Sequence, residues 1–118
     1  MNNLSFDYFQ HLAKGFAIYK ETLNDDNKVI YPVLGLVSES GEVADKIKKI
    51  MRDTNIPLKD LPMETKVEIT KELGDCLWYI ALIADELEFD LSEVAEGNIS
   101  KLTSRRNRDK LSGSGDNR

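Results

Sequence analysis

Two long segments of the chain carry apolar side chains at the spacing of an α-helix, and this periodicity favours a helical fold. The first segment opens at Tyr31 and ends near Met51 or Arg52, and the second runs from about Met63 to Glu88. On each segment, at ~100° per residue, the apolar residues gather on one face. These faces comprise Val33, Leu36, Val37, Val43, Ala44, Ile47, Ile50 and Met51 in the first segment, and Ile69, Leu73, Cys76, Leu77, Ile80, Ile83, Ala84 and Leu87 in the second. We therefore expect two long helices that pack against each other.

Each of these helices also carries two acids three residues apart, at the edge of its apolar face. The pairs are Glu39 with Glu42, and Glu72 with Asp75. When each helix is viewed from its N-terminus, the acid pair lies on the same flank of the apolar face. Antiparallel packing of the two faces would therefore bring the pairs together. Crowded carboxylates repel one another, and a hard divalent cation such as Mg²⁺, Ca²⁺ or Mn²⁺ relieves that repulsion. Solvated surface acids show the same spacing, so the pattern alone leaves both interpretations open.

A further helix is expected before this pair. Ser5 can cap its start, and an apolar stripe continues to about Thr22. The polar stretch from Asn24 to Lys28 is expected to be a loop.

A last helix is expected after the pair, because Asp90 and Glu93 have the spacing of a capping box. Residues 107–118 are polar and contain Gly and Ser, so we expect no regular structure there. The chain should therefore form one all-α domain over residues 1–106, with a four-helix bundle-like fold completed by oligomerisation, followed by a C-terminal tail over residues 107–118.

Composition narrows the class of protein further. The 118 residues are 41% hydrophobic, which suits one compact core. The net charge of −5 argues against general nucleic-acid binding, which needs a basic surface. The single Cys76 cannot form a disulfide within the chain, which fits a reducing compartment. No apolar run approaches the ~20 residues of a membrane span, and the N-terminus does not read as a signal peptide. We expect a cytoplasmic protein that does not bind membranes.

The second long helix is apolar on more than one side. Trp78 and Ala81 lie opposite its main apolar face, and Leu82 lies well outside that face. A helix of this kind must be buried on several sides. Since four short helices cannot surround it, we expect a homodimer or a homotetramer.

The segment GLVSESGEVADKIKK, followed by KELGDCLWYIA, resembles the MazG-like nucleotide pyrophosphohydrolases. These belong to the all-α NTP pyrophosphatase group, whose mark is ExxE, a spacer and then ExxD. The resemblance begins near Tyr31 and includes NISKLTSRR and the terminal GSGDNR. The spacer between Glu42 and Glu72 is slightly longer than is typical, which a longer loop between the helices would absorb. The resemblance implies hydrolysis of nucleoside triphosphates to monophosphate and pyrophosphate, with a role in nucleotide-pool housecleaning.

The resemblance also implies roles for particular residues. The four acids Glu39, Glu42, Glu72 and Asp75 would hold Mg²⁺, with Mn²⁺ as a substitute, and would carry the catalysis. We favour Glu39 as the general base, because it lies nearest the apolar face.

Basic residues supply candidate phosphate contacts. Asn98 and Lys101 form the NxxK element, for which the resemblance implies phosphate or metal contacts, and Arg105 continues their stripe. Basic residues near a helix end also complement its dipole, which is the structural alternative. Lys46 and Lys49 can either remain solvated or reach substrate phosphates.

Three other functions would also use paired helices or apolar helix faces. A ferritin-like di-iron bundle needs Glu-x-x-His pairs, which neither acid pair provides. A relative acting on dUTP, dCTP or phosphoribosyl-ATP stays open, because base selectivity depends on pocket details. A non-catalytic helical module that oligomerises through Trp78 also stays open, and it should tolerate the loss of Glu72.

Overall fold

The computed structural model describes residues 3–118, which are helical with no strand in that range. The elements in order are α1 (Phe6–Lys14), the 3₁₀ turn η1 (Ile18–Glu21), α2 (Asp25–Lys28), α3 (Ile30–Asp53), the 3₁₀ turn η2 (Leu58–Asp60), α4 (Met63–Glu86) and α5 (Leu91–Asn107). The expected all-α class is confirmed. No helix in this range is long and apolar enough to cross a membrane.

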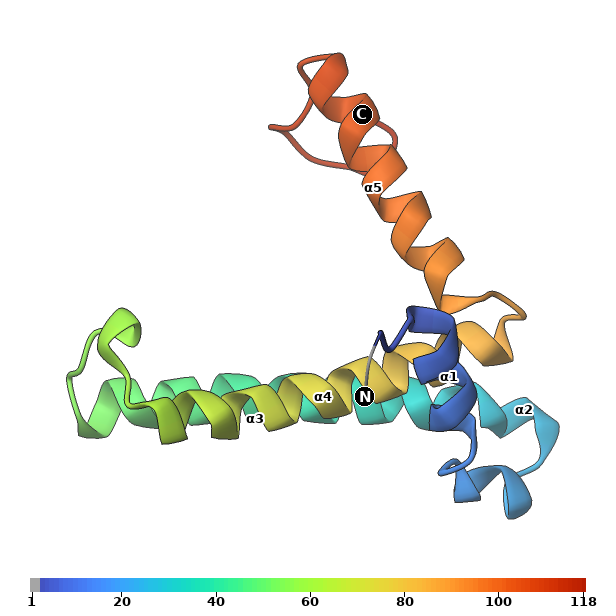
Figure 1. The fold of residues 1–118 in the computed structure, drawn as a ribbon, viewed down its shortest axis with the longest axis horizontal. Coiled ribbons are helices and arrows are strands. Elements are labelled where there is room, and N and C mark those ends of the chain that lie inside the picture. The colour runs from blue at the N-terminus through green and yellow to red at the C-terminus, as the bar shows by residue number, and fades with distance from the viewer. Residues whose placement is uncertain (1–2) are drawn as a thin grey trace.

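Helices α3 and α4 form a long antiparallel hairpin that makes one arm of the molecule (Figure 1). Their bounds differ from the expected ones by no more than two residues. Gly35 allows a close approach in this pair, because a Cβ at Gly35 would lie only 2.3 Å from ring atoms of Tyr79. The α4 helix ends before Glu88, whose φ of +64° is the left-handed conformation common after a helix C-terminus.

The N-terminal region differs from the expected single helix. Ser5 caps α1 as expected, since its Oγ accepts a hydrogen bond from the Tyr8 backbone N–H at 3.1 Å. The helix nevertheless ends at Lys14, just before Gly15, which is a poor helix former. The chain then turns, and this turn places Tyr19 against Tyr31 of α3, with ring centroids 4.4 Å apart. The prediction of one helix to Thr22 is therefore wrong.

The expected loop from Asn24 to Lys28 is also wrong, because it contains the short helix α2. Asn24 caps this helix, with its Oδ1 accepting a hydrogen bond from the Asn27 backbone N–H at 3.2 Å. The polar residues predicted a loop, but Asn24 is a favourable N-cap and the residues after it form a short helical turn.

The buried core lies where α1 crosses α4, rather than between α3 and α4. Its fully covered members are Ala13, Ala17, Tyr19, Ala81, Leu82 and Leu91. Trp78 belongs to the same contact, and its indole N–H donates to the Ala13 carbonyl at 3.1 Å. Ala81 and Leu82 lie outside the main apolar face of α4, as expected, but the residues that cover them belong to the N-terminal part of the same chain and not to a partner subunit.

Two side chains of α1 fix the corner between α4 and α5. The Gln10 amide N donates to the carbonyls of Ala81 and Phe89, and its Oε1 accepts from the Leu91 N–H at 3.0 Å. Asp7 accepts from both the backbone N–H and the hydroxyl of Ser92. These bonds satisfy buried backbone groups that would otherwise lack partners.

From this corner α5 projects away from the α3/α4 arm (Figure 1). The expected capping box at its start is present, because the Asp90 N–H donates to the Glu93 carboxylate at 2.8 Å. One chain alone thus has an open angle between two arms.

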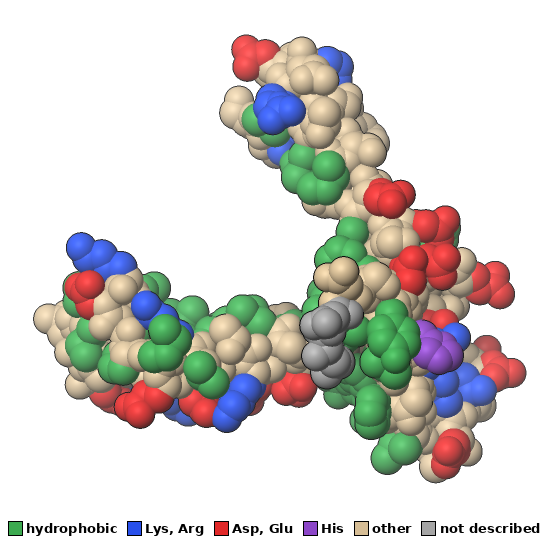
Figure 2. Space-filling view, viewed as in Figure 1, with side chains coloured by type: hydrophobic (Ala, Val, Ile, Leu, Met, Phe, Trp, Pro, Cys, Tyr) green, Lys and Arg blue, Asp and Glu red, His purple; other side chains and the backbone are tan. Residues whose placement is uncertain are grey.

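The inner side of this angle is apolar. Figure 2 shows hydrophobic side chains along the edge of the α3/α4 arm that faces α5, and charged side chains along the opposite edge. Val37 is 68% exposed and Leu73 is 51% exposed, although both belong to the faces expected to be buried. Near the corner, Leu36, Ile80, Ile83, Ala84, Leu87 and Val94 line a cavity of about 210 Å³. We call this set of exposed and cavity-lining residues the inner surface.

The C-terminal tail has no helix or strand beyond Asn107, as expected, yet it folds back on α5. The Arg105 guanidinium is buried and donates to the carbonyls of Gly115 and Asp116, at 3.2 and 2.6 Å. Arg108 donates to the carbonyl of Arg118 at 2.9 Å. The tail is therefore held against the end of α5.

The contact between α1 and α4 can be tested by truncating Leu82. Leu82→Ala should lower the free energy of unfolding by ~2 to 5 kcal/mol, because it leaves a cavity in a fully buried site. Urea unfolding followed by circular dichroism measures this change. The matched control is Ile18→Ala, whose side chain is 76% exposed and whose loss should cost less than ~0.5 kcal/mol. Equal costs for the two variants would contradict the position of the core.

Candidate functional site

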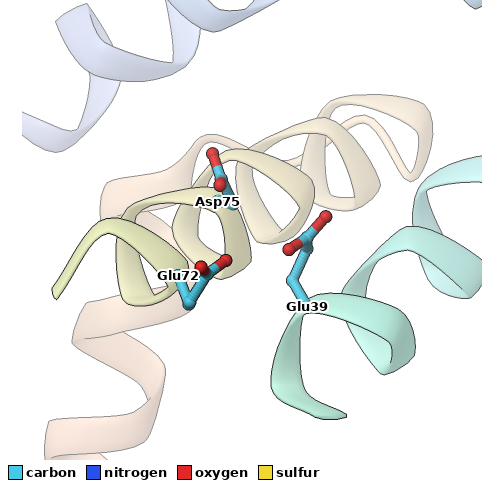
Figure 3. Close-up of side chains that lie close together, drawn as sticks. All are labelled: Glu39, Glu72 and Asp75. Atoms are coloured by element: carbon cyan, nitrogen blue, oxygen red, sulfur yellow. The ribbon is translucent and has the colours of Figure 1, made fainter. Parts of the chain in front are cut away.

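Three carboxylates from the two long helices converge at the edge of the α3/α4 contact. Glu39 comes from α3, and Glu72 and Asp75 come from successive turns of α4 (Figure 3). One carboxylate oxygen from each residue lies within 4.8 Å of the other two. We call these residues the acid cluster. The expected meeting of the two acid pairs is thus found for three of the four acids.

The electrostatics of the cluster are unfavourable without a counter-charge. Partial burial, followed by the charges of Asp75 and Glu72, raises the pKa of Glu39 above its usual range. Each cause penalises the charged form of Glu39, so a cation among the three acids would stabilise the site.

The donor set suits a hard divalent cation. All three residues offer carboxylate oxygen, which Mg²⁺ and Mn²⁺ prefer over softer ligands. Ligand oxygens at about 2.1 Å from one ion lie at most ~4.2 Å apart, so small side-chain rotations bring these three into range. Glu39, Glu72 and Asp75 are therefore the residues that would hold such an ion.

Glu42 lies one turn from Glu39, but it is exposed and outside the group of three. Its charge still contributes to the raised pKa of Glu39 as the smallest of the causes. A helical wheel could not show that Glu39 joins the cluster and Glu42 does not. It gives the direction in which a side chain leaves the helix, but not how close its carboxylate comes to the other helix.

Of the two expected lysines on α3, one lies at the cluster and the other does not. The Lys46 Nζ is 3.2 Å from the Glu72 carboxylate, and Lys46 is only partly exposed. The Lys49 ammonium pairs instead with Asp45 on its own helix. Lys46 is thus the cation nearest to a ligand of the candidate metal site.

The expected residues of α5 are not brought to the cluster within one chain. Asn98 and Lys101 are exposed on the arm that projects away, and the Lys101 Nζ lies 3.5 Å from Asp116 of the tail. Arg105 is 5% exposed and is engaged by the tail. The direction of α5 depends on the α1 corner, which a sequence pattern does not reveal.

Tyr79 is a neighbour of the cluster that the motif alone did not single out. It lies one turn after Asp75, and its ring lies over Gly35, one turn before Glu39. Burial, then the charges of Tyr31, Glu39 and Asp75, raises the pKa of Tyr79. The signal in the sequence was its spacing, because Glu68, Glu72, Asp75 and Tyr79 follow one another at three or four residues and so share one side of α4.

Comparisons with known proteins agree with this arrangement. The chain is similar to the Gene 37 protein of Mycobacterium phage L5, with 41% identity over 116 residues that cover 95% of this chain and 97% of the relative. It is also similar to the uncharacterized protein YvdC of Bacillus subtilis strain 168, with 33% identity over 59% of this chain and 68% of the relative. No solved structure gives a significant match. The family model of the MazG nucleotide pyrophosphohydrolase domain matches residues 32–108, and the chain therefore belongs to this family.

Proposed function

We propose that this protein hydrolyses nucleoside or deoxynucleoside triphosphates to the monophosphate and pyrophosphate, with Mg²⁺ bound at the acid cluster. The observation that carries the proposal is the convergence of Glu39, Glu72 and Asp75 in a chain of this family. Housecleaning of the nucleotide pool would be its role, and Mn²⁺ would substitute for Mg²⁺.

In the proposed reaction, a water oxygen attacks the α phosphorus and the bond from that phosphorus to the bridging oxygen of the β phosphate breaks. When bound, the cation neutralises charge on the phosphate oxygens and makes nearby water more acidic. Glu39 accepts the proton of the attacking water, and its partial burial favours this role. Glu72 and Asp75, together with Glu39, would hold the cation, and Glu42 lies one turn from Glu39 in an exposed position. The electron pair of the broken bond leaves with pyrophosphate.

The charged end of the arm supports binding of the phosphates. Lys46 lies beside Glu72, so its ammonium would balance part of the substrate charge. Lys49 would contribute at longer range, since it is paired with Asp45.

We also propose that the protein is a homodimer or a homotetramer that forms through the inner surface. The apolar stripe that contains Val37 and Leu73 is open to solvent in one chain, and exposed patches of this kind commonly mark interfaces. On a helical wheel this stripe lies roughly 160° from Glu39 on α3 and from Asp75 on α4, so assembly leaves the acid cluster accessible. A second copy would also bring its own α5, with Asn98, Lys101 and Arg105, toward this arm.

The first test concerns metal and product. Mg²⁺ should raise the melting temperature, because a ligand that binds the native state stabilises it. Glu72→Gln should abolish that rise and the turnover, whereas Glu64→Gln, in the exposed first turn of the same helix, should change neither.

Phosphorus NMR should show pyrophosphate as the first product from an NTP panel that includes dUTP and dCTP. Orthophosphate as first product, or no turnover of any substrate, would overturn the proposal.

The second test concerns the basic residues of α5. Lys101→Ala should leave the fold intact and lower turnover ~10- to 1000-fold, the scale for losing one electrostatic stabiliser. Arg105→Ala should lower turnover less. If Lys101 acts on the acid cluster of a second copy, mixing the Lys101→Ala and Glu72→Gln chains should raise turnover above the sum of the two variants measured alone. Full activity of Lys101→Ala alone would exclude this role.

The third test concerns assembly. Multi-angle light scattering should give at least twice the 13.4 kDa of one chain. Val37→Asp should lower the measured mass, because it places a charge in the apolar stripe, whereas Val67→Asp on another side of α4 should not. A monomer at micromolar concentration for the unaltered protein would contradict the proposed oligomer.

A further inference from the structure

A shallow cavity of about 210 Å³ lies where α2 meets the first turns of α3. Its lining residues are Leu23, Asn27, Ile30, Tyr31 and Leu34. Four of these are apolar or aromatic, and Asn27 offers both a donor and an acceptor on its side-chain amide. An apolar site with one polar group is the usual composition of a pocket for a small planar ligand.

Tyr31 links this cavity to the acid cluster. Its ring stacks on the buried Tyr19, with centroids 4.4 Å apart and an interplanar angle of 22°. Tyr19 therefore holds one face of the Tyr31 ring in place. The Tyr31 side chain is still 43% exposed. Tyr79 follows on α4, with its ring over the Gly35 backbone. An aromatic path therefore leads from the cavity to Glu39.

The spacing along α3 matches the shape of a nucleotide. Tyr31 and Glu39 are eight residues apart on one helix, which corresponds to about 12 Å along its axis. They lie roughly 80° apart around the helix, so Tyr31 is the lining residue that connects the cavity to the side of α3 that carries Glu39. A base separated from its phosphates by a ribose can span this distance.

The two directions along α3 from Glu39 differ in chemistry. On the other side of Glu39 the arm carries Lys46 beside Glu72, and then Asp45 with Lys48 and Lys49. Stacking needs an aromatic face, whereas the terminal phosphates need cations. Along α3, the surface is therefore charged on one side of Glu39 and aromatic on the other.

We propose that this cavity receives the nucleobase of the substrate, with the terminal phosphates directed toward Lys46. Tyr31 provides the stacking face and the Asn27 amide meets the edge of the base. The inference rests on the proposed function, because it assumes phosphates at the acid cluster. It adds the orientation of the nucleotide and two specificity residues outside the acid motif.

The test compares two ligands that share phosphates but differ in the base. Isothermal titration in Mg²⁺ would measure binding of a non-hydrolysable α,β-methylene deoxynucleoside triphosphate and of inorganic tripolyphosphate. Tyr31→Ala should weaken binding of the nucleotide ~10-fold, the scale of one base–aromatic stack, and leave tripolyphosphate binding unchanged. Tyr31→Phe, which keeps the ring, should bind as the unaltered protein does.

Two further variants separate base binding from loss of packing. Leu34 is 65% exposed, so Leu34→Trp should fill the cavity without removing a buried contact and should weaken only nucleotide binding. Tyr8→Ala is the matched control, because Tyr8 is a similarly exposed tyrosine on α1 away from the cavity. Asn27→Asp should change the relative affinities for different bases.

The outcomes distinguish this inference from the proposed function. Unchanged nucleotide binding in both Tyr31→Ala and Leu34→Trp would overturn the base site alone. Equal weakening of nucleotide and tripolyphosphate binding by Leu34→Trp would also overturn it. If the unaltered protein binds neither ligand, and Glu72→Gln changes neither turnover nor the effect of Mg²⁺ on the melting temperature, the proposed function fails. The base site then fails with it.

Discussion

The antiparallel contact between α3 and α4 determines where the chemistry of this chain can occur. Gly35 has no Cβ, so the Tyr79 ring can lie directly on the α3 backbone and the helices approach closely. This approach brings carboxylates from both helices within 4.8 Å, although their charges repel. The two helices hold the carboxylates there, and Lys46 offsets part of the repulsion at Glu72. The site is therefore prepared for a positive charge before any ligand arrives.

Much of this contact could be predicted from the sequence. A helix repeats every 3.6 residues, so the pattern of apolar residues fixes on which side of α3 Glu39 lies and on which side of α4 Glu72 lies. The pattern also shows that the two sides agree in an antiparallel pair. It cannot show that Glu42 stays outside the group, because that depends on side-chain reach and on the rotation of each helix in the contact.

Other features depend on interactions that periodicity does not encode. Ala81 and Leu82 read as a second apolar side of α4, but only the turn after Lys14 decides that α1 covers them. Likewise, the faces that contain Val37 and Leu73 were expected to be buried, yet they remain exposed because α5 leaves the arm. An apolar pattern reports that a surface should be buried and does not identify the partner.

The hydrogen bonds of Gln10 have a consequence for where the functional unit begins. The family match starts at residue 32, yet Gln10 and Asp7 hold the corner from which α5 departs. A fragment limited to residues 32–108 would leave the Leu91 N–H and the Phe89 carbonyl without these partners and would expose Ala81 and Leu82 to water. The angle between the arms is therefore a property of the N-terminal residues. The acid motif and the direction of α5 are thus determined by different parts of the chain.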